Sequence, residues 1–192
     1  PIVPRINPKQ DKYGYWTTET VPGGGDKARD FSYMNANPSG QETGAMTTAG
    51  IAALVICKSE LMKYKPYLDS EWFGKTDKGI YDGLAWLSKN FTVESNPGGS
   101  GWHFYYLYGL ERAGTLTQKE FIGTYQWYNL GAKYLIRTQS ATGYWNAGAN
   151  PAFQGAGNEN WFGVDTAYAL LFLKRATVPV DVPIVPPAIT GG

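Results

Sequence analysis

Residues 131–145 read GAKYLIRTQSATGYW, and this stretch decides the fold that the sequence predicts. Its last seven residues, QSATGYW from Gln139 to Trp145, share a pattern with QDKYGYW from Gln10 to Trp16. In both, three residues separate a glutamine from Gly-Tyr-Trp. A phrase that recurs along a chain is typical of repeat architectures, in which each unit packs against the next. Because prolines at positions 4 and 8 stand where a helix should precede the first copy, we expect the chain to begin inside a repeat.

Apolar periodicity and helix-start patterns predict five helices: residues 44–63, 77–91, 102–113, a fourth that follows a capping box at 117–120 and ends at 138, and 165–176. The second and fourth are amphipathic, whereas the other three are apolar around most of their circumference. Amphipathic helices suit an outer layer and apolar helices an inner one. The sequence therefore predicts an all-α fold, a partial α/α toroid of about two and a half to three hairpins. Long Gly/Asn-rich loops are expected at 14–43, 92–101 and 140–164.

Proline-rich ends frame the predicted domain. We expect a linker and the remnant of a repeat at 1–12, the α/α repeat domain at 13–176 and a second proline-rich linker at 177–192. The chain opens with Pro1, which predicts a piece cut or processed from a longer protein, with an export signal among the parts that could have been removed. We expect a soluble chain without a transmembrane segment, since no apolar run approaches 18 residues.

The order Gly131, Tyr134-Leu135, Gln139, Gly143 and Trp145 resembles the glutamine–tryptophan (QW) repeat of the terpene cyclase and prenyltransferase superfamily, which includes squalene-cyclase-like α/α toroids. The resemblance extends from about residue 10 to residue 176 and is most specific at 131–145. It implies that the glutamine caps an outer helix while the tryptophan packs on a neighbouring repeat. The structural clamps implied in this way are Gln10, Trp16, Gln139, Gly143 and Trp145.

The catalytic groups of that superfamily are not matched. Its terpene cyclases protonate their substrate with the middle aspartate of Asp-x-Asp-Asp-Thr-Ala, but here Val164 precedes Asp165-Thr-Ala. A valine has no proton to donate. Its protein prenyltransferases hold zinc with Asp, Cys and His, and here Cys57, His103 and Asp165 lie one on each inner helix. Cys57 falls about ten residues into its helix whereas the other two lie at helix starts, so their spacing along the axis predicts no metal site.

No cofactor is expected either, because the glycine run at 23–25 is not followed by the Lys-Ser/Thr of a phosphate loop. The net charge of +1, without a run of Lys or Arg, argues against nucleic-acid binding. For Asp165 the sequence favours a cap in the first turn of its helix, with a role facing a central cavity as the alternative. For His103 it favours a structural role, with binding or general-base work as the alternative.

A ligand pocket is predicted at the N-terminal ends of the third and fifth helices. Its expected lining is Trp102, His103, Tyr105, Trp161, Asp165 and Tyr168. The candidates for a catalytic role are Asp165, His103 and Glu159.

Three functions follow, in this order. The first is a non-catalytic binding or scaffold module of a larger protein with squalene-cyclase-like repeats. The second is a fragment of a terpenoid cyclase whose acid motif lies outside this chain. The third is a carbohydrate-binding or polysaccharide-cleaving toroid, in which Glu159 could pair with Asp165. The expected partners are an apolar or carbohydrate small molecule, and other repeats of the parent chain or a second copy.

Overall fold

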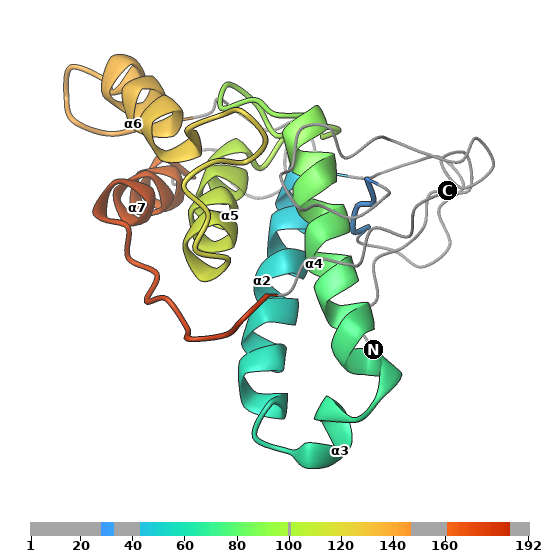
Figure 1. Ribbon diagram of the computed structural model, residues 1–192. Helices are drawn as coiled ribbons and strands as arrows, with labels where there is room; N and C mark the ends of the chain where they lie inside the picture. The colour runs from blue at the N-terminus through green and yellow to red at the C-terminus, as the bar shows by residue number, and fades with distance from the viewer. Residues whose placement is uncertain (1–27, 33–42, 100, 147–160, 185–192) are drawn as a thin grey trace.

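The computed structural model describes residues 28–32, 43–99, 101–146 and 161–184, and this part of the chain is helical, as predicted. Its helices are α2 (Gly44–Leu61), α3 (Lys65–Leu68), α4 (Glu71–Lys89), α5 (His103–Leu116), α6 (Trp127–Thr138) and α7 (Trp161–Lys174) (Figure 1). Between residues in these ranges there is one β pairing, an isolated bridge between Ile122 and Tyr125. The all-α expectation is confirmed.

Three helices, α2, α5 and α7, pack side by side in a row, and α4 and α6 pack against this row. The central helix α5 packs against α2 on one side and α7 on the other, while α4 packs on α2, and α6 on both α5 and α7. The predicted inner helices are therefore neighbours, and the predicted outer helices each lie against inner ones (Figure 1). The core includes Ile51, Leu87, Tyr106, Leu107 and Leu110, none of which is exposed.

Helix α4 differs from the predicted outer helix in its start and its environment. It begins at Glu71, six residues before the predicted start, and it buries every residue from Gly79 to Ser88. The segment 28–32 contributes to this cover. Arg29 forms an ion pair of 2.8 Å with Asp82, and the Phe31 ring occupies the space beside Gly83. Because a chain segment covers this half of the helix, its amphipathic pattern does not correspond to a solvent-exposed face.

The capping box predicted at 117–120 is wrong. Thr117 instead ends α5, where its hydroxyl donates to the Ala113 carbonyl at 2.7 Å. Gln118 and Gly123 then have φ values of 53° and 61°, which a right-handed helix does not permit. The next helix, α6, begins only at Trp127, so residues 117–126 form a loop.

The predicted start of the last helix is also wrong. Helix α7 begins at Trp161, so Asp165 lies in its second turn and not at a cap. A first-turn cap needs free backbone N–H groups, and these end within the first four residues of a helix. Capping is therefore not the role of Asp165.

The first part of the predicted C-terminal linker lies along the helices. Figure 1 shows it leaving α7 and running toward α2. The buried Glu111 carboxylate accepts hydrogen bonds from the backbone N–H and hydroxyl of Thr177, and Lys58 donates to the Pro183 carbonyl at 2.6 Å. The side chain of Val182 is buried. Residues 177–184, called the strap below, are thus anchored to both α5 and α2.

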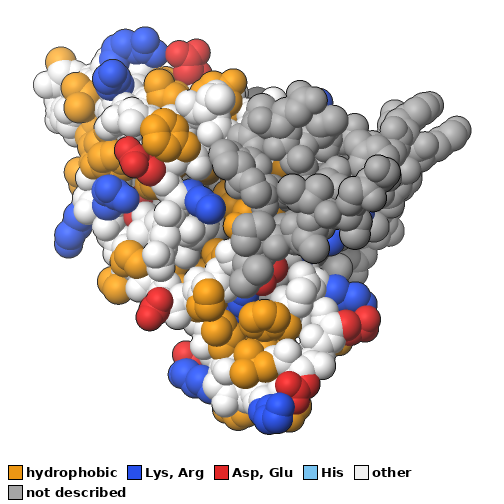
Figure 2. All heavy atoms as spheres, in the orientation of Figure 1, with side chains coloured by type: hydrophobic (Ala, Val, Ile, Leu, Met, Phe, Trp, Pro, Cys, Tyr) orange, Lys and Arg blue, Asp and Glu red, His pale blue; other side chains and the backbone are white. Residues whose placement is uncertain are grey.

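Helix α2 is long and apolar enough to cross a membrane, judged by length and composition alone, which the sequence analysis did not anticipate. Half of it is buried within the protein, against α4 and α5, as expected for the core helix of a folded domain. Hydrophobic side chains do reach the surface near the C-terminal end of α2 and the N-terminal end of α4 (Figure 2). The large ones exposed there are Leu61, Tyr64, Leu68 and Trp72.

Candidate functional site

Hydrogen bonds of the Gln139–Trp145 segment link the end of α6 to α7. The Gln139 side-chain amide donates to the Gly143 carbonyl at 2.9 Å, across a turn in which Gly143 has φ 91°, a backbone conformation suited to glycine. The Trp145 indole is buried and donates from Nε1 to the Leu135 carbonyl at 2.8 Å. Its backbone N–H donates to Thr166 Oγ1 at 3.1 Å. Gln10 and Trp16 lie outside the described residues.

Several predicted ligand residues lie close together where α5 and α7 meet. The Tyr105 ring is 6.2 Å from the Trp102 ring and 5.6 Å from the Tyr168 ring, centre to centre, and Tyr108 stacks on Tyr168 at 5.3 Å. Trp102 is 44% exposed and has φ 61°, so α5 starts directly after a left-handed residue. Trp161 is the first residue of α7, but its side chain, like the whole of Glu159, lies outside the described residues.

His103 is the first residue of α5, and its ring lies 5.2 Å from the rings of Phe104 and Tyr134, centre to centre. A carbonyl only accepts, so the 2.9 Å contact between His103 Nε2 and the Val93 carbonyl places the proton on Nε2. Burial lowers the pKa of His103, while the Val93 hydrogen bond and the charges of Asp165 and Glu94 act in the opposite direction. The ring is therefore neutral at pH 7. The charge of Asp165 acts on His103, but neither residue lines either of the two cavities described below.

Acid should destabilise the protein through His103. Because its pKa is lower in the folded state than in the unfolded chain, its contribution to stability is full above about pH 6.5 and is lost as pH falls toward the folded value. We expect the free energy of unfolding to fall by at most about 1.4 kcal/mol per pH unit over this range. His103→Gln should remove that dependence, which urea unfolding between pH 7.5 and 5 would measure. Since the chain has one histidine, parallel curves for the two proteins would contradict the assignment.

A groove runs between α2 and α5, beside the clustered rings of Tyr105, Tyr108 and Tyr168. It has a volume of about 270 Å³ and is called the α2/α5 groove below. The α2 wall consists mostly of small side chains, and the α5 wall carries two tyrosines and an arginine; the lining is Ala45, Thr48, Ala49, Ala52, Ala53, Ile56, Tyr105, Tyr108, Gly109 and Arg112. Arg112 donates to the Tyr108 hydroxyl at 3.2 Å. The groove is thus apolar along its length and polar at one edge.

Burial raises the pKa of Tyr168, and the neighbouring Tyr105, Tyr108 and Asp165 raise it further. The phenol therefore stays protonated at neutral pH and can donate a hydrogen bond.

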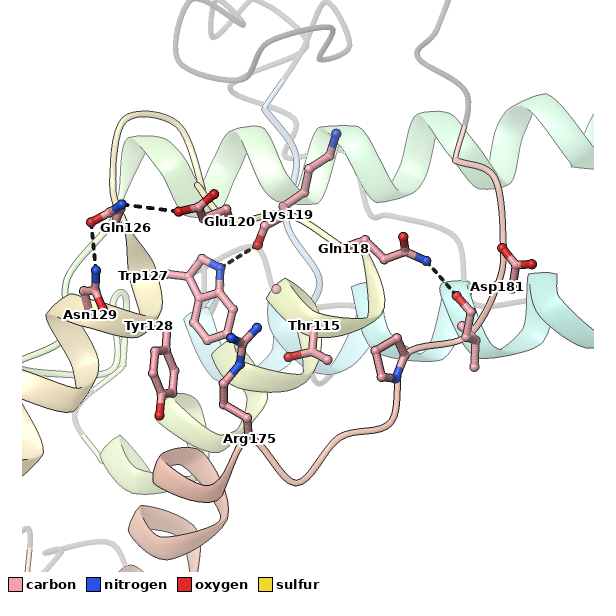
Figure 3. A pocket seen from close by; sticks show the side chains of 13 residues that line it. Thr115, Gln118, Lys119, Glu120, Gln126, Trp127, Tyr128, Asn129, Arg175 and Asp181 are labelled. Carbon is pink, nitrogen blue, oxygen red and sulfur yellow. Dashed lines mark hydrogen bonds between the residues drawn. The ribbon is translucent and has the colours of Figure 1, made fainter.

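The structure has a second, larger cavity that the sequence analysis did not predict. It has a volume of about 680 Å³ and lies between the C-terminal ends of α5 and α7, the start of α6 and the strap (Figure 3). Trp127, Tyr128 and Arg175 contribute to its lining, and it is called the Arg175 cavity below. The cavity lies where residues 117–126 form a loop. The sequence pattern predicted a helix over these residues and therefore did not indicate a cavity.

The three residues considered for zinc do not form a metal site. Cys57 is exposed on α2, whereas His103 begins α5 and Asp165 lies on α7. Within the described ranges, no group of three or more His, Cys, Asp or Glu side chains is placed to hold a metal ion.

Comparisons with protein-family models, with curated proteins and with solved structures gave no match to this chain.

Proposed function

We propose that this chain is a non-catalytic ligand-binding module of a larger protein with squalene-cyclase-like and prenyltransferase-like repeats. Its ligand is an apolar chain of the isoprenoid type, held in the α2/α5 groove. The observation that carries the proposal is the lining of that groove, where alanine side chains of α2 face Tyr105 and Tyr108 of α5.

The groove suits a branched apolar chain in its chemistry. Ala49, Ala53 and Ile56 offer methyl groups without a polar atom, and the two alanines are small enough to leave space in the groove. The tyrosine rings supply apolar faces, and burial of such surface is the main driving force for binding a hydrocarbon. Arg112 at the polar edge suits the hydroxyl or charged head that ends an isoprenoid.

Architecture supports the proposed relationship to the repeat family. Helices α2, α5 and α7 form a row with α4 and α6 packed against it, and Gln139 and Trp145 close the end of α6. Those are the arrangements that the QW resemblance implies. In a toroid, the free face of α2 and α5 would line the central hollow, and further repeats of the parent protein would complete the ring.

A non-catalytic module is favoured over a cyclase. Val164 is 39% exposed on α7 at the position where the related cyclases hold their proton donor. Protonation of an alkene needs a shielded acid, and an exposed valine supplies neither the proton nor the shielding.

Filling the groove should abolish binding. Farnesol, a short isoprenoid alcohol, is expected to bind the wild-type chain in titration calorimetry, and Ala53→Trp should weaken binding by about tenfold or more. The half-buried Ala53 lines the groove, so an indole there occupies the space of the ligand. Ala167→Trp is the matched control, because Ala167 is exposed on α7 and lies outside the groove lining. Equal affinity in all three proteins, or no binding to the wild type, would overturn the proposal.

A further inference from the structure

We infer that the Arg175 cavity is a second binding site, specific for an acidic saccharide such as an oligouronate. The cavity lies at the C-terminal ends of α5 and α7 and shares no lining residue with the α2/α5 groove. The inference therefore stands or falls independently of the function proposed above. Its volume of about 680 Å³ lies within the range of typical small-molecule sites, about 300–1,000 Å³.

Arg175 is the group that would bind the carboxylate. Its guanidinium lies over two aromatic rings, 5.7 Å from the centre of Trp127 and 4.9 Å from that of Tyr128. Among the described residues, no side-chain hydrogen bond or ion pair engages it. Stacking on the rings restricts the guanidinium while its N–H groups stay available. A restrained guanidinium matches the two oxygens of a carboxylate.

Side-chain amides would bind the sugar hydroxyls. On the α6 side, Asn129 Nδ2 donates to Gln126 Oε1 at 2.8 Å, and Gln126 Nε2 donates to Glu120 at 3.4 Å. On the strap side, Gln118 Nε2 donates to the Val180 carbonyl at 3.1 Å. Figure 3 shows these two groups on either side of Arg175. Each amide keeps donor or acceptor capacity after these bonds, which suits hydroxyls that both donate and accept.

The charges of the lining favour carboxylates spaced one to a sugar over a compact polyanion. Two cations, Lys119 and Arg175, are accompanied by two carboxylates, Glu120 and Asp181. A di- or triphosphate would place several negative charges beside those carboxylates, where like charges repel. A saccharide with one carboxylate on each sugar can direct that group to Arg175 and its hydroxyls to Glu120 and Asp181.

The arrangement of the aromatic rings in the cavity also favours an acidic saccharide over a neutral one. Trp127 is 1% exposed, and the Arg175 guanidinium lies over both rings. Neither ring offers an open face on which a neutral sugar could stack. Recognition therefore depends on the guanidinium and requires an anionic group on the ligand.

The test compares digalacturonate with cellobiose, a neutral disaccharide of similar size, and with inorganic phosphate, by titration calorimetry on the full chain. Digalacturonate should bind the wild type at least about tenfold more tightly than either of the other probes. Arg175→Gln should weaken digalacturonate binding by about tenfold or more, and Arg175→Lys, which keeps the charge but not the planar fork, by an intermediate factor. Arg175 is exposed, so neither variant should perturb folding, which thermal unfolding would check.

Arg112→Gln is the matched control, because Arg112 lines the α2/α5 groove and should not affect digalacturonate. Raising the salt concentration should weaken binding to the wild type more than to Arg175→Gln. Equal digalacturonate affinity in the wild type and Arg175→Gln, or no binding at all, would overturn the inference. Phosphate or cellobiose binding as tightly as digalacturonate would overturn the assignment to acidic saccharides.

Discussion

Replacing Lys58 with methionine should lower the free energy of unfolding by about 3–5 kcal/mol. The Lys58 side chain is fully buried, and its ammonium donates to Asp77 at 2.5 Å and to the Pro183 carbonyl at 2.6 Å. It also lies 4.4 Å from the centre of the Phe73 ring. Methionine fills much of the same space but leaves the buried Asp77 carboxylate without its lysine, and it removes an anchor of the strap. Urea unfolding would measure the loss.

The surface pair Lys65–Asp69 provides the control. It has the same residue types and a separation of 2.6 Å, but its side chains are 81% and 59% exposed. Lys65→Met should therefore change stability by less than about 1 kcal/mol. In the double variant Lys58→Met, Asp77→Asn, part of the loss should be recovered because the buried charge is removed. If Lys58→Met costs no more than Lys65→Met, the buried pair does not hold α2, α4 and the strap together.

Replacing Gly109 with alanine should lower the free energy of unfolding by about 1–3 kcal/mol, and with leucine by more. Gly109 is buried where α5 crosses α2, and a Cβ there would overlap Thr48 Oγ1 and lie 3.0 Å from Thr48 Cβ. Both atoms belong to a helix wall that cannot move without displacing the core. Thermal or urea unfolding would measure the effect.

Gly74 is the matched control, because a Cβ at this position in α4 meets nothing within 4 Å. Gly74→Ala should stabilise the protein by up to about 1 kcal/mol, since alanine favours the helix and restricts the unfolded chain. If both alanine variants stabilise the protein, the close approach of α2 and α5 is not as tight as the structure indicates. Thr48→Ala combined with Gly109→Ala should recover part of the loss.

The five longer helices could be predicted because their apolar patterns are strong, whereas the four-residue helix α3 was not predicted. The first was expected at 44–63 and runs from Gly44 to Leu61, and the third was expected at 102–113 and begins at His103. Boundaries failed where the local sequence signal was outweighed by the conformation of the chain. The Thr117–Glu120 pattern resembles a helix start, but Gln118 adopts a positive φ and Trp127 Nε1 donates back to the Lys119 carbonyl at 2.8 Å. Neither is visible in a single stretch of sequence.

The same limit applies to the sites. The proximity of Trp102, Tyr105 and Tyr168 follows from placing them on adjacent inner helices, which periodicity predicts. The Arg175 cavity instead depends on a loop and on the strap, both set by long-range contacts such as that between Glu111 and Thr177. Proline-rich composition at 178–187 predicts an extended chain but does not say that its first part docks.

The most direct test of ligand binding in the α2/α5 groove is an NMR titration of the ¹⁵N-labelled chain with farnesol. We expect saturable shifts of the backbone amides of residues that line the groove, at Ala49, Ala53, Tyr105 and Tyr108, while exposed positions of α6 such as Ile136 stay unchanged. Ala53→Trp should suppress those shifts. Shifts confined to other surfaces, or none as farnesol reaches its solubility limit, would contradict the claim that this chain binds an apolar ligand in the groove.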